Sequence, residues 1–369
     1  MKRILYLTRG GAVGGSQRQL FYVVTNLDDI YEPIVVSSGD GQFFSELLNE
    51  GINTKVFTLH SWRKFCSFPS RYMDANRLTM YAKEHQVSLV HSSDLWMSSY
   101  MIWVARRLKI PSILHIRKPI SPDEIHKHHC NRATAIIAIS RRIKQNLLDA
   151  GIPLEKIKLI DDGVNLDVFR PRTAGENVLR RDFSPVGQVL AGIVGRIQSS
   201  KRQLEFLKAA RQIIQNSKGN VTFFVIGENY CRSYSKLLER FVSQDGLSKH
   251  IVFTGRRDDM PQVLGSLDIL VSLSGGSVMF EAMACGKVVV SAGFSNEETS
   301  VHIQNGRTGV LVSSARTSDL AEALKYVIDA PEVRSRIGQE ARKWAENNFC
   351  HITMADKTQQ LYLQLLSAD

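Results

Sequence analysis

The sequence of 369 residues predicts an α/β protein built from two doubly wound domains, each a parallel sheet covered by helices on both faces. Three observations support this prediction. Short apolar runs alternate with segments of helical periodicity, a polar stretch interrupts the alternation, and the alternation then starts again. The chain is also long for one hydrophobic core, and 43% hydrophobic with 22% charged residues is typical of folded domains.

The first half of the chain supplies the strands and helices of one domain. We expect strands at residues 4–7, 34–36, 55–59, 89–91, 113–116, 135–139 and 158–160. Between most of them, apolar residues recur with helical spacing at residues 16–25, 71–85, 98–108 and 141–150. Because a helix carries the chain back between strands, neighbouring strands are expected to run parallel.

A polar, turn-rich stretch at residues 161–182 is the predicted linker. The second half then repeats the pattern, with expected strands at residues 189–194, 221–226, 251–254, 269–273, 288–291 and 309–312. Expected helices lie at residues 203–214 and 233–243, at 278–284, and along 318–367. Such sheets bind ligands outside the carboxyl ends of their strands, so two facing domains would direct both sets of strand ends toward one cleft.

Composition narrows the classes of partner. The formal charge of +11 calls for an anionic partner, which nucleic acid, a membrane surface or a phosphorylated small molecule could each provide. Lys and Arg are dispersed along the sequence without a nucleic-acid-binding motif, which disfavours nucleic acid. No apolar run approaches the roughly 20 residues of a membrane span, and the first residues predict a strand rather than a signal peptide. Five scattered cysteines without a C-x-x-C pair favour a reducing compartment, so we expect a cytoplasmic protein.

A glycine-rich segment, GGAVGGS at residues 10–16, follows the first expected strand and opens a helix. Gly14 and Gly15 are predicted to let the backbone approach an anionic ligand at the helix N-terminus, while the alternative is a flexible turn. The spacing does not match G-x-G-x-x-G, although Asp40 lies where a dinucleotide site would carry its acid. A nicotinamide-dependent oxidoreductase therefore remains only an alternative.

Two passages resemble a known family. Residues 131–171 contain a strand, a helix capped by Ser140 and the turn Asp162-Gly163-Val164-Asn165, and residues 280–286 read FEAMACG. Both resemble the retaining GT-B glycosyltransferases of family 4, also called glycosyl transferases group 1, although Asp162 stands where the family commonly has Asn and Asn165 where it commonly has Asp. The resemblance implies two Rossmann-like domains facing across a cleft. The first, residues 1–165 with a C-terminal helix at 350–369 crossing back to it, would bind the acceptor, and the second, residues 166–349, would bind the nucleotide-sugar.

The resemblance also assigns site residues in the second domain. Arg196 and Lys201, in a passage similar to V-G-R…K-G, would contact the donor diphosphate, whose developing charge must be neutralised as the sugar leaves. Glu281 in EAMACG would accept hydrogen bonds from the donor ribose. Gly227 and Arg256, each at the end of an expected strand, would lie near the nucleotide. Outside this context, an Arg and a Lys in a loop are more often solvated surface charges.

The sequence departs from the family pattern beside this site. Leu273 stands where the family usually carries a second Glu, and Val301 falls where a G-x-P-E glutamate is expected. The shortened loop retains Gly275, Gly276 and Ser277, whose N–H groups could still meet phosphate oxygens. These departures remove two glutamates that the family usually carries, so a catalytically degenerate relative that binds nucleotide or a partner is the alternative.

In the first domain, the family often places a His near the strand end at residues 113–116, and His115 or Arg117 could take that role beside Lys118. On the resemblance, His115 would be catalytic, and Arg117 and Lys118 would lie on the acceptor side. A lone His is more often structural. The cluster of His126, His128 and His129 has no complete ligand set, so a solvated segment is favoured over a metal site. The family requires no metal or other cofactor besides the nucleotide-sugar substrate.

Residues 61–71, SWRKFCSFPSR, combine basic and aromatic side chains. Trp62, Arg63, Lys64 and Phe65 could contact the headgroups of a membrane's inner face, and the alternative is a loop that packs its aromatics onto its own domain. The resemblance thus implies a retaining glycosyltransferase that uses a saccharide or lipid-linked acceptor, with cell-envelope polysaccharide or glycoconjugate synthesis as its setting.

Overall fold

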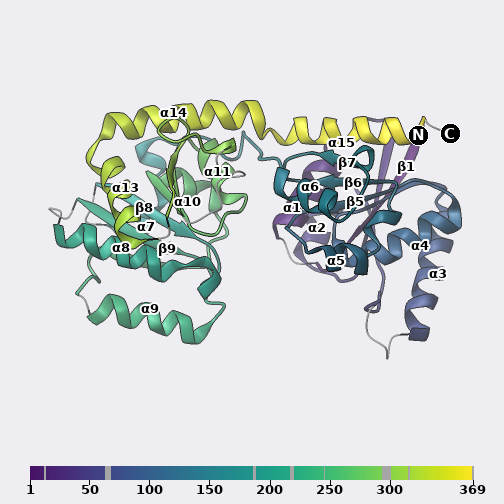
Figure 1. Cartoon of the computed structure of the whole chain (residues 1–369), viewed down its shortest axis with the longest axis horizontal. Coiled ribbons are helices and arrows are strands. Elements are labelled where there is room, and N and C mark those ends of the chain that lie inside the picture. The colour runs from purple at the N-terminus through teal and green to yellow at the C-terminus, as the bar shows by residue number, and fades with distance from the viewer. Residues whose placement is uncertain are drawn as a thin grey trace. The chain divides into compact units, whose positions relative to one another are not determined.

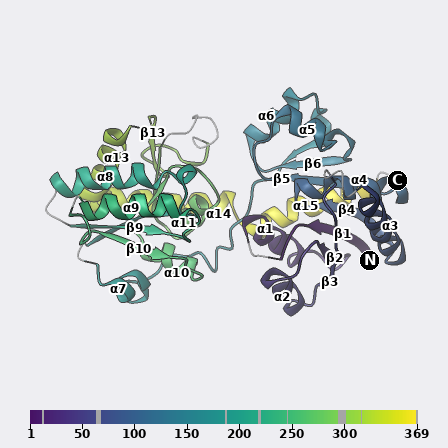
Figure 2. The same ribbon diagram turned by 90° about the horizontal axis from the view of Figure 1, so that it is seen from below.

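The computed structural model describes residues 1–11, 14–62, 68–185, 188–216, 220–244, 246–292, 301–314 and 316–367. The chain divides into two compact units: unit 1 comprises Met1–Gly163 and His351–Asp369, and unit 2 comprises Val164–Cys350. Each unit is a parallel sheet with helices on both faces (Figure 1, Figure 2), so the prediction of two doubly wound α/β domains is confirmed.

The sheet of unit 1 has the strand order β3-β2-β1-β4-β5-β6-β7, and every neighbouring pair is parallel. Its strands are β1 (Lys2–Thr8), β2 (Tyr31–Ser37), β3 (Asn53–Val56), β4 (Val87–Ser92), β5 (Ser112–Ile116), β6 (Ala135–Ala138) and β7 (Ile157–Leu159). The order runs outward from β1 in one direction to β3 and in the other from β4 to β7. The direction of winding therefore reverses between β1 and β4, which is where sheets of this kind bind ligands.

Helices cover the two faces of this sheet because successive strand residues point to opposite sides. Leu5 and Leu7 of β1 pack in a core with the helices α3 (Phe68–Glu84), α4 (Ser98–Leu108), α5 (Pro122–Lys127) and α6 (Arg141–Asp149). Ile4 and Tyr6 pack on the other side with α1 (Gly15–Val24), α2 (Gln42–Asn49) and α15 (His351–Leu366). Both faces are buried, which explains why the strands read as continuous apolar runs.

The C-terminal helix α15 belongs to unit 1 and completes one of its two cores. Met354, Leu361 and Tyr362 of α15 pack among residues of β1, β2 and α1. The hydroxyl of Tyr362 lies 3.0 Å from the hydroxyl of Tyr6 in β1, and both rings are fully buried. The last helix therefore returns to the first domain, as the resemblance implied.

The sheet of unit 2 has the order β10-β9-β8-β11-β12-β13, again with parallel neighbours. Its strands are β8 (Val189–Val194), β9 (Val221–Ile226), β10 (Ile251–Gly255), β11 (Ile269–Ser272), β12 (Val288–Ala292) and β13 (Val310–Val312). Winding reverses between β8 and β11. Unit 2 therefore repeats the topology of unit 1, with its own position for a ligand at that reversal.

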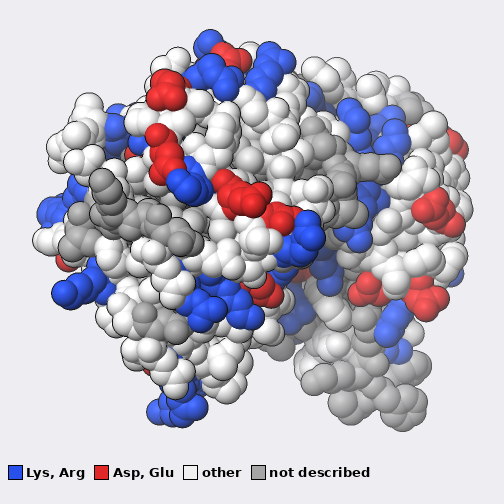
Figure 3. Space-filling model, turned by 60° about the vertical axis from the view of Figure 1, so that its left-hand side comes forward, with Lys and Arg blue, Asp and Glu red and all other residues white. Residues whose placement is uncertain are grey.

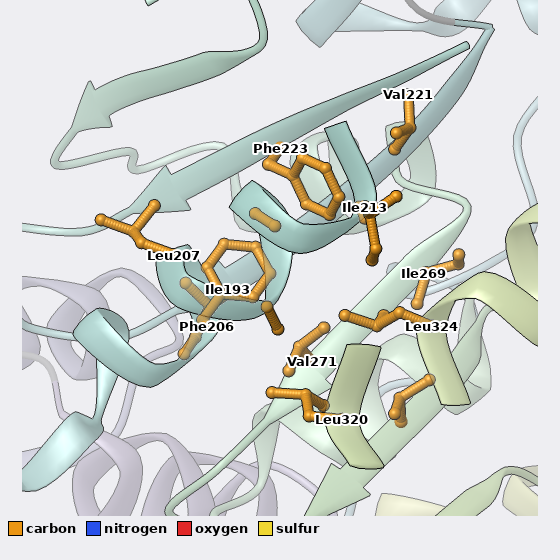
Figure 4. Packing of buried hydrophobic residues seen from close by; sticks show 14 of the residues in the cluster. Ile193, Phe206, Leu207, Ile213, Val221, Phe223, Ile269, Val271, Leu320 and Leu324 are labelled. Atoms are coloured by element: carbon orange, nitrogen blue, oxygen red, sulfur yellow. The ribbon is translucent and has the colours of Figure 1, made fainter. Parts of the chain in front are cut away.

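Two cores sandwich the sheet of unit 2. On one face, α8 (Gln203–Asn216), α9 (Arg232–Gln244) and α13 (Thr317–Asp329) cover the strands, and Ile193 and Val271 meet Phe206 of α8 and Leu324 of α13 (Figure 4). On the other face lie α10 (Met260–Ser266), α11 (Val278–Ala284) and α14 (Pro331–Asn348). The strand ends that carry the candidate site residues are thus fixed by packing from both sides.

The stretch predicted as a linker is more structured than its composition suggested. Residues 164–182 belong to unit 2, and α7 (Val178–Phe183) forms within the stretch with Val178 and Leu179 buried against α10. Asn177 caps α7, because its side chain accepts a hydrogen bond from Arg180 N. The turn residues of the segment therefore lead into a docked helix rather than a free connection.

Candidate functional site

Glycines tie together the carboxyl ends of three strands in unit 2. Gly195, directly after β8, donates its N–H to Ile226 O at 2.9 Å, and Gly227, after β9, donates to Gly255 O at 3.0 Å. Gly227 has a φ of 150°, and a Cβ atom there would lie 2.1 Å from Gly195 O. Glycine is therefore required at position 227 to hold the two loops in contact. This structural role does not depend on nucleotide binding.

The two predicted cations lie in the loop that follows β8. Arg196 is exposed, with its guanidinium 4.8 Å from the centre of the Tyr230 ring. Lys201 ends a one-turn 3-10 helix, Ser199–Lys201, and its Nζ donates to Ser274 Oγ at 3.1 Å. Because Ser274 follows β11, Lys201 bridges the two strands between which winding reverses. Lys201 therefore lies beside the reversal of winding, where sheets of this kind bind ligands, and its contact with a donor stays a prediction.

The electrostatics at this position favour an anion. Burial, and secondly the charge of Arg196, lower the pKa of the Lys201 ammonium. Among the described residues, no carboxylate forms an ion pair with Arg196 or with Lys201. Two neighbouring cations that repel each other and lack a carboxylate partner in this part of the chain would both be stabilised by a bound phosphate.

The loop between β11 and α11 brings the predicted glycines to the same edge of the sheet. Gly275 and Gly276 have positive φ values of 67° and 116°, which explains the need for glycine at both. Ser277 precedes α11, where its carbonyl accepts from Glu281 N at 3.1 Å. Glu281 is half-buried in the first turn of α11. Lys201, Ser274, Gly275, Gly276 and Ser277 thus come together after β8 and β11.

Arg256 lies at a different part of this edge. It follows β10, the outermost strand on that side, and its Nε donates to Asp258 Oδ1 at 3.0 Å. The side chain is 63% exposed. In the sheet, β9 lies between the strand that precedes Arg256 and the strand that precedes Lys201, and Arg256 has a carboxylate partner of its own.

Leu273, which stands in place of the family's second Glu, is part of the hydrophobic core of unit 2. Leu273 is 3% exposed and packs in the same hydrophobic cluster as Val271 and Leu320. The side chain at position 273 points into the protein, so this position does not offer a group to a ligand at the strand end. Val301 is half-buried in a short helical segment, and the nearby Glu297 and Glu298 lie outside the described residues.

Unit 1 has a cavity of about 340 Å³ that gathers the residues predicted there. It lies at the carboxyl ends of β4 and β5 and beside the start of α1. Its lining residues are Ser16, Ser93, Asp94, Leu95, Trp96, His115, Ile116, Arg117 and Lys118. We call it the His115 cavity. The structure therefore brings His115, Arg117 and Lys118 together beside the reversal of winding between β1 and β4.

His115 is held in one protonation form by its neighbour. Arg117 Nη2 lies 3.1 Å from His115 Nδ1, and a guanidinium can only donate, so Nδ1 accepts and the ring proton is on Nε2. Burial, and secondly the charge of Arg117, lower the pKa of His115 well below its usual value. Nε2 is buried without a hydrogen-bond partner among the described residues. His115 is thus a neutral ring with one donor left to satisfy.

The sequence did not predict the residues that support His115. Arg117 is paired with Asp162, a contact that gives a role to the Asp found where the family commonly has Asn. The ring of His91 in β4 stacks on that of His115, with centroids 5.6 Å apart. His91 Nδ1 in turn lies 2.6 Å from the hydroxyl of Tyr362. The only signal available beforehand was that His91, like His115, stands at the end of an expected strand.

The glycines of the first loop take their places at the start of α1. Gly14 is the N-cap residue and its carbonyl accepts from Arg18 N at 2.9 Å, while Gly15 is the first helical residue, next to Ser16 of the His115 cavity. Ala12 and Val13 lie outside the described residues. Gly14 and Gly15 belong to unit 1, whereas Arg196, Lys201 and Glu281 belong to unit 2.

Two further sequence hypotheses meet the structure only in part. Trp62 is half-buried, with its ring centre 5.1 Å from Tyr100 and 6.0 Å from Trp103, as in the alternative of a loop that packs onto its own domain. Arg63, Lys64 and Phe65 lie outside the described residues, so the membrane contact stays a prediction. No helix in the described ranges is long and apolar enough to cross a bilayer.

Neither a concentrated patch of one charge on the face shown in Figure 3 nor a metal-ligating group is found among the described residues. On the face drawn in Figure 3, Lys and Arg lie in several separate groups with Asp and Glu between them. Within the described part of the chain, no three His, Cys, Asp or Glu side chains are grouped so that they could hold a metal ion. His126 is exposed, whereas His128 is buried.

Known families match most of the chain. The family described as Glycosyl transferases group 1 matches residues 178–344, and Glycosyltransferase Family 4 matches residues 13–168. Among curated relatives, the D-inositol 3-phosphate glycosyltransferase of Rhodococcus erythropolis is 26% identical over 289 residues, which cover 70% of this chain and 64% of that protein. The chain covers less than two thirds of the length of the first such relatives that it matches.

Solved structures share the fold. HepE of Anabaena, crystallised in complex with UDP-glucose, has a TM-score of 0.85 and 22% identity, covering 99% of this chain and 100% of that one. A glycosyltransferase from Rickettsia africae has a TM-score of 0.87 and 21% identity, covering 100% of this chain and 99% of the other. At these identities the likeness establishes the fold alone. From the two family matches, one to each half, the chain belongs to the GT-B glycosyltransferases of family 4, described as glycosyl transferases group 1.

Proposed function

We propose that this protein is a retaining glycosyltransferase that moves a sugar from a nucleotide-sugar onto a saccharide or lipid-linked acceptor. The observation that carries the proposal is the position of Lys201. Its ammonium joins the loop after β8 to Ser274 after β11, at the reversal of winding and beside Arg196. A diphosphate bound there would meet two cations at the ligand position of the sheet.

The chemistry needs such a site. As the acceptor oxygen forms its bond to the anomeric carbon, the bond from that carbon to the diphosphate breaks and charge develops on the departing oxygen. Arg196 and Lys201 would stabilise that charge without reorganisation, since their side chains are already in place. Glu281, in the first turn of α11, would hold the donor ribose, as the family resemblance implies.

We assign the acceptor to the His115 cavity. The neutral His115 has a donor N–H to offer but no free lone pair, because Arg117 occupies its Nδ1. His115 would therefore orient a ligand oxygen rather than remove the acceptor's proton, and that proton would pass to the departing diphosphate oxygen on the same face of the sugar. This route retains the anomeric configuration without the paired carboxylates of a glycosidase.

A structurally similar protein indicates which donors to test first. HepE was crystallised with UDP and with UDP-glucose, so uridine diphosphate sugars are the first donors we propose. The curated relatives named D-inositol 3-phosphate glycosyltransferases act on a small phosphorylated acceptor, as their names state, and the same chemistry is compatible with Arg117 and Lys118. We propose a cytoplasmic setting in the synthesis of envelope polysaccharides or glycoconjugates, with membrane contact at residues 62–65.

A second candidate function rests on Leu273. Since the side chain in place of the family's second Glu is buried in the core, the donor sugar loses one expected contact. A catalytically degenerate relative would keep the diphosphate site and bind nucleotide without transferring sugar. Turnover of a bound nucleotide-sugar separates the two functions.

The test is a thermal-unfolding panel of UDP, GDP, ADP, their common sugar conjugates and NAD. A ligand at 100 times its dissociation constant stabilises the folded state by about 2.7 kcal/mol. We expect one nucleotide diphosphate to raise Tm in the wild type but not in Arg196→Ala or Lys201→Ala. Lys236→Ala, on the exposed side of α9, is the matched control and should respond like the wild type.

Each other result has a consequence. Stabilisation by NAD alone would favour the oxidoreductase. A response that persists in both Arg196→Ala and Lys201→Ala would move the nucleotide site away from β8. No response to any nucleotide would overturn the proposed function, and binding without sugar transfer to water or acceptor would favour the degenerate relative.

A further inference from the structure

A second cavity lies in unit 1, next to the His115 cavity. Its volume is about 470 Å³, within the roughly 300–1,000 Å³ of small-molecule sites. It opens at the carboxyl ends of β1, β2 and β3, on the other side of the reversal of winding from β5. Its lining includes Arg9, Ser38, His60, Trp62, Trp96 and Tyr100. We call it the His60 cavity.

His60 is oriented by a buried carboxylate. Its Nδ1 lies 2.8 Å from Asp74 Oδ2, and the same oxygen accepts from the backbone N–H of His60 at 2.9 Å. The Asp74 side chain is 5% exposed, whereas that of His60 is 45% exposed. Because a carboxylate accepts, Nδ1 carries a proton, and Nε2 is the ring nitrogen left for a ligand. In the neutral ring, Nε2 accepts a hydrogen bond.

Further contacts make this arrangement rigid. The hydroxyl of Tyr100 donates to His60 O at 2.7 Å and lies 3.4 Å from Asp74 Oδ2. Tyr100 also meets the ring of Trp62 edge-on at 5.1 Å, and Trp62 packs on Tyr72 at 5.5 Å. The cavity therefore has an aromatic wall fixed by ring packing. The ring of His60 is held in place by its contact with Asp74.

The chemistry of the lining points to a saccharide ring. Aromatic side chains suit the apolar C–H face of a sugar, and His60 with the serine hydroxyls can accept from and donate to its hydroxyls. Among the lining residues that the structure describes, Arg9 is the single Lys or Arg side chain, and its guanidinium already lies 5.4 Å from the centre of the Trp96 ring. A site for a phosphate would instead be lined mainly by donors and cations.

Trp96 connects this cavity to the acceptor site. It lines both the His60 cavity and the His115 cavity, and the residue is 43% exposed. We propose that the His60 cavity is a second saccharide subsite, so that the acceptor is an extended saccharide with one unit in each cavity and Trp96 between them. This inference rests on the proposed function, since it assigns the acceptor's further unit.

Binding can be tested without any activity. The chain has four tryptophans, so the indole N–H signals in an NMR spectrum can be assigned with four Trp→Phe variants, and Trp344 in unit 2 serves as an internal reference. The probes are linear di- and trisaccharides of common hexoses, the matching methyl monosaccharides, and inorganic phosphate. We expect at least one longer saccharide to move the Trp62 and Trp96 signals together, and His60→Ala to weaken that response about tenfold.

The kinetic test uses any acceptor found to be glycosylated, in a longer and a shorter form. We expect the ratio of kcat/KM between the two to fall about tenfold in His60→Ala and in Asp74→Asn, mainly through KM of the longer acceptor. His126→Ala, an exposed His on α5, is the control. Circular dichroism and Tm establish that the variants are folded.

The outcomes separate this inference from the proposed function. Movement of Trp62 by phosphate but not by any saccharide would make the cavity an anion site and overturn the inference. Movement of Trp96 alone, no movement of Trp62 by any probe, or an unchanged kcat/KM ratio in His60→Ala would also overturn it. A saccharide response at Trp62 in a protein that transfers no sugar would support the subsite while contradicting the transferase.

Discussion

The ammonium of Lys201 and the hydroxyl of Ser274 lie 3.1 Å apart, on two loops that are 73 residues apart in sequence. The contact spans the reversal of winding between β8 and β11. Lys201 is thus held at the edge of the sheet by a partner that carries no charge of its own. Its positive charge remains available to a ligand, which a carboxylate partner would have neutralised.

This contact predicts graded effects on nucleotide binding. Lys201→Ala should weaken the affinity for the nucleotide diphosphate roughly ten- to hundredfold, because a charge-assisted hydrogen bond is lost. Ser274→Ala should weaken it only a few-fold, since the ammonium stays but loses its anchor. Isothermal titration calorimetry measures both, with Ser335→Ala on the exposed side of α14 as the control. An equal loss in Ser274→Ala and Lys201→Ala would contradict a positioning role for Ser274.

Replacing Leu273 with Glu should not rebuild the family's second carboxylate. Leu273 is 3% exposed within the core of unit 2, so Leu273→Glu would bury a charge without a partner. We expect a loss of about 3–5 kcal/mol in the free energy of unfolding. Leu273→Met, which keeps the volume, should cost less than about 1.5 kcal/mol. Urea unfolding gives both values, and a stable Leu273→Glu with improved turnover would show that the loop can turn this side chain outward.

Gly227→Ala should be strongly destabilising. The new Cβ atom would lie 2.1 Å from Gly195 O, which is backbone, and the φ of 150° is unfavourable for any side chain. We expect a loss of about 3 kcal/mol or more in the free energy of unfolding. Gly175→Ala is the matched control, because its Cβ would meet no atom within 4 Å, and it should change stability by less than about 0.5 kcal/mol. Equal melting temperatures for the two variants would contradict the close approach.

The buried histidines predict acid sensitivity. Burial, and secondly the charge of Arg117, lower the pKa of His91 to about 3, and the pKa of His115 is also lowered. In the unfolded chain each His binds a proton near pH 6.5, so the folded state is penalised as pH falls below that value. Above about pH 7 each His is neutral in both the folded and the unfolded state, so the pH dependence of stability from these residues vanishes. Stability should therefore decrease from pH 7 toward pH 4.

The contribution of His91 can be isolated by substitution. Each buried His contributes a slope of up to about 1.4 kcal/mol per pH unit between its two pKa values. His91→Gln should reduce that slope, although it also changes the contact with Tyr362. His126→Gln, at an exposed position on α5, should leave the slope as in the wild type. Chemical unfolding at several pH values measures the slopes, and identical slopes for wild type and His91→Gln would contradict the proposed titration.

Sequence reasoning predicted most of the fold and the residues next to strand ends. Arg196 and His115 were singled out by the family resemblance, whereas the apolar runs before them predicted only that each lies near the end of a strand. The pairing of Lys201 with Ser274 was not predicted, because the alternation of strands and helices does not state which strands are neighbours. The burial of Leu273 was also not predicted. The sequence shows that Leu replaces Glu at this position, but not whether the side chain points into the core or toward the strand end.

The residues behind His115 were beyond sequence reasoning for a different reason. Asp162 was noted only as a departure from the family, and its partner Arg117 lies 45 residues earlier. His91 and Tyr362 are 271 residues apart, and each looks unremarkable in its own strand or helix. Local periodicity reports which face of an element is buried. It does not report which polar side chains meet inside that face.

The packing of Tyr362 on Tyr6 has a consequence for biosynthesis. A ribosome releases β1 before unit 2 and α15 after it. Unit 2 has all of its residues available before unit 1 does, so the second half of the protein can fold while the first half still lacks one wall of its core. The nascent first half therefore exposes an apolar surface until α15 has been synthesised, and truncation before residue 351 should leave that surface open to chaperones and proteases.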